Sequence, residues 1–121
     1  MAERPKTWAR PVVFFEIQAK DVEKMVSFYR EMFEWEITPG NIPGFLSIGS
    51  GIGAPTEGIG GVMSATDTPR VVIGVQVADI RDALVHAEEL GGRALMQPFD
   101  VPGGPTVARI ADPEGNELCS A

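Results

Sequence analysis

An internal repeat is the sequence feature that most constrains the fold of this chain. A shift of 58 positions (76 − 18) places the segment VFFEIQAKDVEKMVSFYREM over VIGVQVADIRDALVHAEEL. Under this shift Gln18 aligns with Gln76 and Asp21 with Asp79, and the apolar positions match more widely than these identities. A matched hydrophobic pattern at a fixed spacing predicts two similar structural units in tandem.

Each copy of the repeat has the pattern of a β-strand followed by an amphipathic helix. In the first copy, residues 12–18 alternate between an apolar face and a mixed face. Asp21 is typical of a helix N-cap, and the apolar spacing after it predicts a helix over 22–33. In the second copy, residues 71–77 form the strand and Asp79 caps the helix. The mixed face of the first strand carries Phe14, Glu16 and Gln18.

Short predicted strands, separated by Gly and Pro, follow each helix. They are Trp35–Thr38, Gly44–Ile48 and Gly58–Met63 in the first half, and Arg93–Gln97, Thr106–Ala111 and Asn116–Ser120 in the second. Each half therefore has the order βαβββ, with modules over about 11–63 and 70–121 of a single domain, 1–121. The predicted fold is α+β, with the helices on one face of the strands and the mixed strand faces lining another surface.

Charge and residue counts exclude several classes of protein. The net charge is −7, from 17 acidic and 10 basic residues, and phosphate-binding surfaces concentrate Lys and Arg, so we expect no nucleic-acid partner. Cys119 and His86 are the single cysteine and the single histidine, which excludes an internal disulfide and multi-cysteine or multi-histidine metal sites. No apolar stretch approaches the length of a membrane-spanning helix. We expect a cytoplasmic protein without a membrane partner.

Two stretches carry a family resemblance: FFEIQAKDVEKMVSFYREMFEWEI near the start, and DPEGNEL before the last predicted strand. In these stretches the chain resembles the vicinal-oxygen-chelate superfamily, which includes glyoxalase I, extradiol dioxygenases and bleomycin-resistance proteins. The resemblance extends over residues 11–121. It implies that the two βαβββ modules curl into a cupped, half-barrel mixed sheet with the helices on the convex side. It also implies a small-molecule ligand in the cup and a homodimer.

Enzymes of this superfamily chelate a divalent metal with His, Glu or Gln side chains from the cup. The corresponding positions in this chain hold no usual ligand, although a thiolate can bind metal. We therefore expect neither a metal nor another cofactor. Carried over one at a time, the ligand positions fall at Phe14, at or beside Val72 and Ile73, near Gly60-Gly61, and at Cys119.

Glu16 is the candidate catalytic residue. It shares the mixed strand face with Phe14, and its repeat partner is Gly74, which has no side chain and leaves space beside it. A carboxylate in a largely apolar cup has a raised pKa, which suits a general acid or base. The alternative is a structural carboxylate that reaches water or pairs with an arginine such as Arg109, because perturbed groups also occur in structural ion pairs.

The other candidate ligand-binding residues are polar and apolar side chains of the predicted strands. Gln18 and Gln76 either hydrogen-bond a ligand together with Glu16 or cap strand ends beside the helix starts. For each apolar candidate, the alternative to contact with a ligand is that the side chain packs in the core. The apolar candidates are Phe14, Trp35, Phe45 and Met63.

Two further features are interpreted without a catalytic role. His86 falls on the flank of the second helix, so Cys119 lacks a histidine base and we expect a buried, inert thiol. Residues 49–54 match G-x-G-x-x-A, but Pro55 follows them where a helix would begin. A dinucleotide loop needs that helix to hold the pyrophosphate, so we reject the motif.

Two functions remain open from the sequence. The first is a metal-free binding protein that holds an apolar or aromatic small molecule in the cup, as bleomycin-resistance proteins hold theirs. The second is a lyase, isomerase or dioxygenase-type enzyme, either metal-free with Glu16 as the acid or base, or with an atypical metal set such as Glu16, Glu57 and Cys119. The missing ligands and the missing nucleophile–base pair favour the binding protein.

Overall fold

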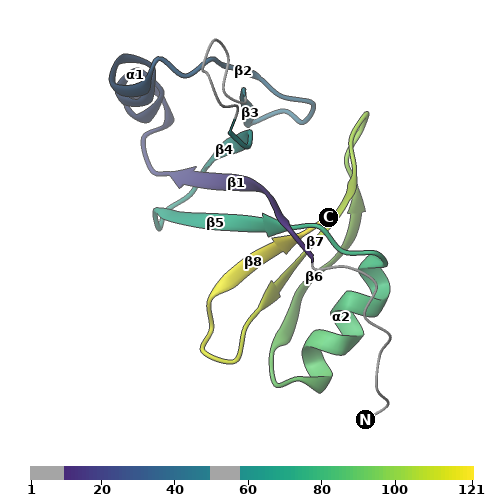
Figure 1. The fold of residues 1–121 in the computed structure, drawn as a ribbon. Helices are drawn as coiled ribbons and strands as arrows, with labels where there is room; N and C mark the ends of the chain where they lie inside the picture. The colour runs from purple at the N-terminus through teal and green to yellow at the C-terminus, as the bar shows by residue number, and fades with distance from the viewer. Residues whose placement is uncertain (1–9, 50–57) are drawn as a thin grey trace.

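The computed structural model describes residues 10–49 and 58–121, which form a mixed β-sheet with one helix beside each half (Figure 1). Most of the glycine-rich motif at 49–54, and Glu57, lie outside the described residues. In chain order the elements are β1 (Val12–Ala19), α1 (Val22–Phe33), β2 (Ile37–Pro39), β3 (Phe45–Ile48), β4 (Gly61–Ala65), β5 (Arg70–Val75), α2 (Ile80–Glu89), β6 (Arg93–Asp100), β7 (Thr106–Ala111) and β8 (Glu117–Ser120).

The eight strands form one sheet in the order β2-β3-β4-β1-β5-β8-β7-β6. β1 pairs with β4 in parallel, β5 pairs with β8 in parallel, and β1 and β5 pair antiparallel at the centre. Each half therefore contributes four neighbouring strands, and the two halves meet at the β1–β5 pair. The sheet is open because β2 and β6 form its edges. The predicted α+β fold with two βαβββ units is confirmed.

Both helices begin at the aspartates that the repeat indicates. The Asp21 carboxylate accepts a hydrogen bond from the Lys24 amide at 3.1 Å, and Asp79 accepts one from the Asp82 amide at 3.0 Å. These bonds satisfy backbone N–H groups that have no partner inside the helix, so each start is fixed locally. Neither of these two described helices is long and apolar enough to cross a membrane.

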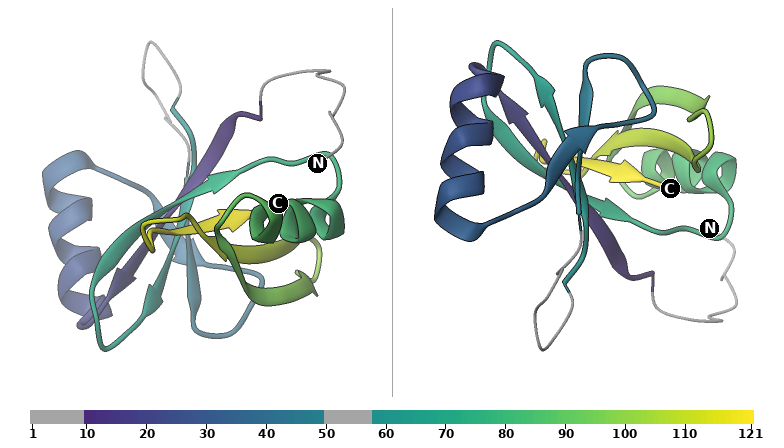
Figure 2. Two further views of the ribbon diagram at one scale, coloured as in Figure 1. Left: turned by 90° about the horizontal axis from the view of Figure 1, so that it is seen from below. Right: turned by 90° about the horizontal axis from the view of Figure 1, so that it is seen from above.

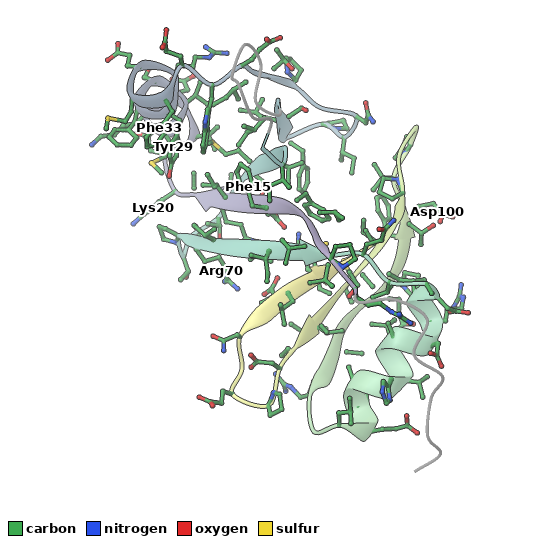
Figure 3. All side chains as sticks on the ribbon, viewed as in Figure 1. Phe15, Lys20, Tyr29, Phe33, Arg70 and Asp100 are labelled. Atoms are coloured by element: carbon green, nitrogen blue, oxygen red, sulfur yellow. The ribbon has the colours of Figure 1, made fainter. Side chains whose placement is uncertain are left out.

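The main core lies between α1 and the first half of the sheet. Alternation along β1 points Ile17 and Ala19 toward α1 and leaves Glu16 on the opposite face. Aromatic rings extend this core along the helix, where Tyr29 and Phe33 lie side by side (Figure 3). Tyr29 also stacks on Trp35 with ring centroids 4.9 Å apart. The buried members of the cluster are Ile17, Ala19, Ile37, Ile48 and Met63, and α1 packs against them with Val22, Met25, Val26 and Tyr29.

The second helix covers the outer strands of its half and leaves β5 open. α2 contacts β6 and β7, and Figure 2 shows the two helices at opposite ends of the sheet. Val71 and Ile73, which belong to the apolar strand face expected from the sequence, are 68% and 42% exposed. The expectation that a helix covers this part of the sheet is therefore wrong, because β8 separates β5 from the β6–β7 pair under α2.

Candidate functional site

The face of the sheet opposite the helices forms a cup between the two halves. Phe14 and Glu16 both line this cup, as the alternation along β1 predicts. Strand pairing continues the row of Phe14 through Gly74 on β5 and Cys119 on β8 to Arg109 on β7. Residues that are far apart in the sequence therefore meet on one surface because the two modules share a continuous sheet.

A cavity of about 710 Å³ occupies the cup. This volume lies within the range of small-molecule sites, roughly 300–1,000 Å³. Glu16 and Arg109 are the only charged residues among the described residues that line it. Most of the wall is apolar, and its larger side chains are Phe14, Phe45, Val62, Met96, Phe99 and Val107.

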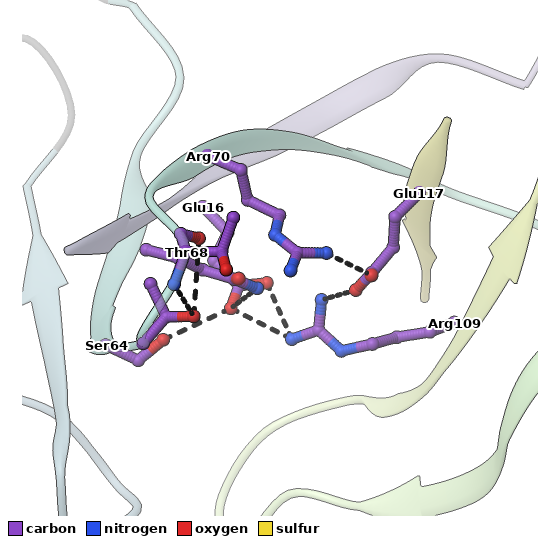
Figure 4. A network of polar contacts seen from close by, with 8 residues as sticks. Glu16, Ser64, Thr68, Arg70, Arg109 and Glu117 are labelled. Carbon is purple, nitrogen blue, oxygen red and sulfur yellow. Dashed lines mark hydrogen bonds and ion pairs between the residues drawn. The ribbon is translucent and has the colours of Figure 1, made fainter. Parts of the chain in front are cut away.

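Glu16 is buried at the floor of the cup and both of its oxygens are engaged (Figure 4). Nη2 of Arg109 donates to Oε1 at 2.7 Å and to Oε2 at 2.9 Å. Oε2 also accepts weaker hydrogen bonds from Gln18 at 3.3 Å and from Ser64 at 3.4 Å. Glu16 therefore forms the ion pair with Arg109, which is the structural one of the two interpretations of this residue. The carboxylate lies in a network of polar groups and not in isolated apolar surroundings.

Arg109 is held by carboxylates on both sides. Its Nη1 donates to Glu117 at 3.0 Å, and Glu117 accepts a second ionic hydrogen bond, at 2.8 Å, from Arg70 (Figure 4). Burial alone lowers the pKa of the Arg109 guanidinium, but the charge of Glu16, its hydrogen bond to Arg109 and the charge of Glu117 together outweigh this effect, so the net pKa is raised. The guanidinium is therefore a permanent cation with a fixed orientation.

The two glutamines of the repeat have different surroundings. Gln18 hydrogen-bonds Glu16 and so supports the ion pair from the side. Gln76 is exposed, and its backbone N–H donates to the carbonyl of Pro11 at 3.0 Å. Neither side chain is among the residues that line the cavity. Direct contact of Gln18 or Gln76 with a ligand stays a prediction.

The apolar candidates divide between the cup and the core. Phe14 and Phe45 line the cavity. Met63 is fully buried on the helix side, because it pairs with Ile17, which faces α1. Trp35 also packs on that side, against Tyr29. For Met63 and Trp35 the structure places the side chain in the core, which was the alternative interpretation.

Several residues of the cup wall were not singled out from the sequence. Met96, Phe99 and Val107 come from the β6–β7 hairpin, and Thr38 and Ser47 come from β2 and β3. Side chains alternate between the two faces of each hairpin, and Met96 pairs with Arg109. With this register known, the alternation would identify the residues that face the cup. That register is interrupted by shifts along β6, so spacing alone does not reveal which residues face the cup.

Cys119 lies in the cup as an unreactive thiol. Its residue is 3% exposed. Burial raises its pKa to about 11, against the opposing effect of the nearby Arg109 charge. The side chain is therefore protonated at neutral pH, and a protonated thiol is neither a good nucleophile nor a metal ligand.

We predict that native Cys119 resists alkylation. Iodoacetamide at about pH 8 should modify it far more slowly in the folded protein than in urea, because the thiolate is scarce and the sulfur is buried. Intact-mass spectrometry measures the rate, and the single cysteine makes the mass shift unambiguous. Equal rates in the folded and unfolded states would contradict a buried, protonated thiol.

The residues at the superfamily's metal-ligand positions do not fit a divalent metal. At the carried-over positions on β5, Val72 and Ile73 have aliphatic side chains without a ligand atom. The neighbouring Gly74 pairs with Phe14, and the Phe14 ring fills the space that a side chain there would need. Gly61 has no side chain, so the Cys119 thiol is the single ligand group at these positions. In the part of the chain that the structure describes, no three His, Cys, Asp or Glu residues are grouped to hold a metal ion.

Comparisons with known proteins identify the fold. A family model described as a glyoxalase-like domain matches residues 13–121, whereas a search of curated proteins found no matching relative. Methylmalonyl-CoA epimerase from Mycobacterium tuberculosis superposes with a TM-score of 0.64 at 12% identity, over 90% of this chain and 85% of that one. Homoprotocatechuate 2,3-dioxygenase from Brevibacterium fuscum gives 0.64 at 17% identity, over 90% of this chain but 35% of the dioxygenase.

A glyoxalase/bleomycin resistance protein/dioxygenase superfamily member from Vibrio splendidus 12B01 also superposes, with a TM-score of 0.59 at 15% identity, over 93% of this chain and 100% of that one. Identities this low establish a shared fold and no shared activity. The family model, by contrast, covers nearly the whole chain. Together with the two βαβββ units around an open cup, it shows that the chain belongs to the glyoxalase-like domain family of the vicinal-oxygen-chelate superfamily.

Proposed function

We propose that this chain is a small-molecule-binding protein that holds an apolar or aromatic ligand in the cup. The observation that carries the proposal is the cavity of about 710 Å³, whose wall is mostly apolar and whose floor holds one ion pair. Ligand sites combine such an apolar wall with a few fixed polar groups. The wall comes from both halves of the sheet, so a ligand there contacts β1, β3, β6 and β7 at once.

The enzymatic alternative has less support from the side chains. An acid or base needs a group that can exchange a proton with the ligand, but both oxygens of Glu16 are engaged by Arg109. Cys119 is a protonated thiol, and His86 contacts Glu89 on α2 rather than the cup. The relatives that are named as an epimerase and a dioxygenase share the fold with this chain, and fold alone does not transfer their reactions.

We further propose that the cup functions without a metal. Tag-free protein incubated in turn with zinc, nickel, manganese and ferrous ions, and then dialysed, should retain far less than one equivalent of each. The reason is that the carried-over ligand positions offer a phenyl ring, two aliphatic side chains, glycines and a single thiol. Metal content by mass spectrometry tests this expectation, and stoichiometric retention of any of the four ions would contradict it.

The binding function is tested with an uncharged fluorescent probe, N-phenyl-1-naphthylamine, and two matched variants. Val107→Trp fills the cup from β7, whereas Val71→Trp makes the same change on the outer face of β5. We expect the wild type and Val71→Trp to bind the probe with similar affinity and Val107→Trp to lose about tenfold or more. Equal affinity in all three proteins would place the probe outside the cup and contradict the proposal.

A homodimer stays a prediction from the family resemblance. Multi-angle light scattering distinguishes a monomer of 13.0 kDa from a particle of twice that mass. We expect the larger mass at micromolar concentration, and the monomer mass would contradict it.

A further inference from the structure

Arg109 supplies a charged hydrogen-bond donor among the residues that line the cavity. Its guanidinium donates hydrogen bonds from Nη2 to Glu16 and from Nη1 to Glu117. No described residue accepts a hydrogen bond from its Nε. Every fully buried side-chain nitrogen or oxygen in the described part of the chain has a partner, so the Nε–H group lies at the accessible surface. Arg109 lines the cavity and its side chain is 20% exposed, so a ligand in the cup can contact this side chain.

Glu16, unlike Arg109, is not accessible to a ligand in the cup. Its side chain is 2% exposed, and its oxygens already accept from Arg109, Gln18 and Ser64. A ligand that bound Glu16 directly would have to displace Arg109 and leave a buried guanidinium without its closest counter-charge, which is costly. The carboxylate therefore acts on a ligand through Arg109, by fixing the orientation of the guanidinium.

The positive and negative side chains at the floor of the cup balance, and this balance determines which ligand charge the floor favours. Arg109 is compensated by Glu16, and Glu117 is compensated by Arg70 at 2.8 Å. An anionic ligand at Arg109 would lie beside the Glu16 and Glu117 carboxylates, and a cationic one would lie beside the guanidinium; both arrangements place like charges together. An uncharged oxygen that accepts a hydrogen bond fits this floor without repulsion.

The walls determine the shape of the ligand. Phe14 and Phe45 project from the first half of the sheet, and Phe99, Met96 and Val107 from the second. Aromatic faces and a polarizable thioether favour flat conjugated rings over branched aliphatic groups. The Phe14 ring in addition lies over Gly74, in the row that leads to Arg109.

We propose that Arg109 is the polar anchor for an uncharged, planar aromatic ligand that carries a carbonyl oxygen, and that Glu16 is the positioning residue for this anchor. The proposal rests on the proposed function, because it names the ligand class of the same cup. It assigns the ligand contact to Arg109 on β7, in the second module, rather than to the carboxylate on β1.

Three probes with one ring system test the ligand class by isothermal titration calorimetry. 2-Acetylnaphthalene is an uncharged ketone, 2-isopropenylnaphthalene has the same shape without an acceptor, and 2-naphthoate is an anion. A hydrogen bond to a charged donor contributes about 1.5–3 kcal/mol, so the ketone should bind about tenfold or more tightly than the hydrocarbon. It should also bind more tightly than naphthoate, because the floor has no net charge.

Two variants separate the anchor from its positioning residue. The double variant Glu16→Gln/Arg109→Met removes both charges together and avoids an unpaired buried carboxylate; it should bind ketone and hydrocarbon equally. Glu16→Gln alone leaves two guanidiniums, Arg109 and Arg70, sharing the Glu117 carboxylate, so the floor gains a net positive charge and the preference should shift toward naphthoate by about tenfold. Glu36→Gln, which removes the same charge at an exposed position outside the cup, should leave the wild-type preference unchanged.

The outcomes are distinguishable. Equal binding of ketone and hydrocarbon by the wild type would overturn the Arg109 anchor and leave the binding function intact. Tighter binding of naphthoate by the wild type would overturn the uncharged ligand class. An unchanged ketone-to-naphthoate ratio in Glu16→Gln would overturn the positioning role of Glu16. If no probe binds, the proposed function itself fails.

Discussion

Arg109→Met should destabilise the protein by about 3 kcal/mol, the largest loss that we expect from a single change in the cup. The Glu16 side chain is 2% exposed, and its strongest partner, Arg109, is 2.7 Å away. Removing the guanidinium leaves a buried carboxylate without its counter-charge, and its hydrogen bonds to Gln18 and Ser64 are too long to replace it. Urea unfolding followed by circular dichroism measures the change in the free energy of unfolding.

Arg70→Met is the matched control for this experiment. Arg70 also pairs with Glu117, but its side chain is 42% exposed, compared with 20% for Arg109. An exposed ion pair contributes less than about 1 kcal/mol, so this variant should remain close to the wild type. The double variant Glu16→Gln/Arg109→Met should recover a large part of the loss of Arg109→Met, because no buried charge is left unpaired. Equal losses for Arg70→Met and Arg109→Met would contradict a buried ion pair at the floor.

Gly74→Ala should destabilise the protein by about 1–3 kcal/mol and weaken binding of an aromatic probe in the cup. A Cβ atom at position 74 would overlap the ring atoms of Phe14, so the ring must swing away from the sheet. The displaced ring would enter the cup, because Phe14 lines the cavity. Unfolding in urea measures the stability, and calorimetry with 2-acetylnaphthalene measures the binding.

Gly58→Ala is the control for the glycine substitution. A Cβ atom at position 58 meets nothing within 4 Å, so this change should alter the free energy of unfolding by less than about 0.5 kcal/mol. Phe14→Ala/Gly74→Ala removes the clashing ring, and its two changes should be strongly non-additive. Additive effects of the two substitutions would show that the Phe14 ring is not what excludes a side chain from position 74.

The sequence was sufficient for the features that depend on local patterns. The repeat, the two βαβββ units and the helix caps at Asp21 and Asp79 are confirmed, because periodicity and N-cap chemistry act within a few residues. The same alternation correctly placed Phe14 and Glu16 on the cup face of β1. The interpretation of Glu16 as the partner of Arg109 was one of two that the sequence left open.

The remaining features depend on strand pairing between distant segments. Met63 faces the core because its register opposite Ile17 is set by the β1–β4 pairing, which sequence spacing does not reveal. Arg109 reaches Glu16 only because β5 and β8 lie between their strands in one continuous sheet. The apolar face of β5 predicts that a helix covers this strand, but α2 contacts β6 and β7 instead. Such long-range arrangements carry no local sequence signature.

Chemical-shift mapping tests the central claim most directly. The claim is that a small uncharged aromatic molecule binds in the cup of this glyoxalase-like domain. Titration of isotope-labelled protein with 2-acetylnaphthalene should shift the backbone amide signals of Val62, Val107 and Arg109, which line the cavity. The amides of Val85 and Glu88, in the separate groove between α2 and β6, should remain in place. Shifts confined to that groove, or no shifts at all, would contradict the claim.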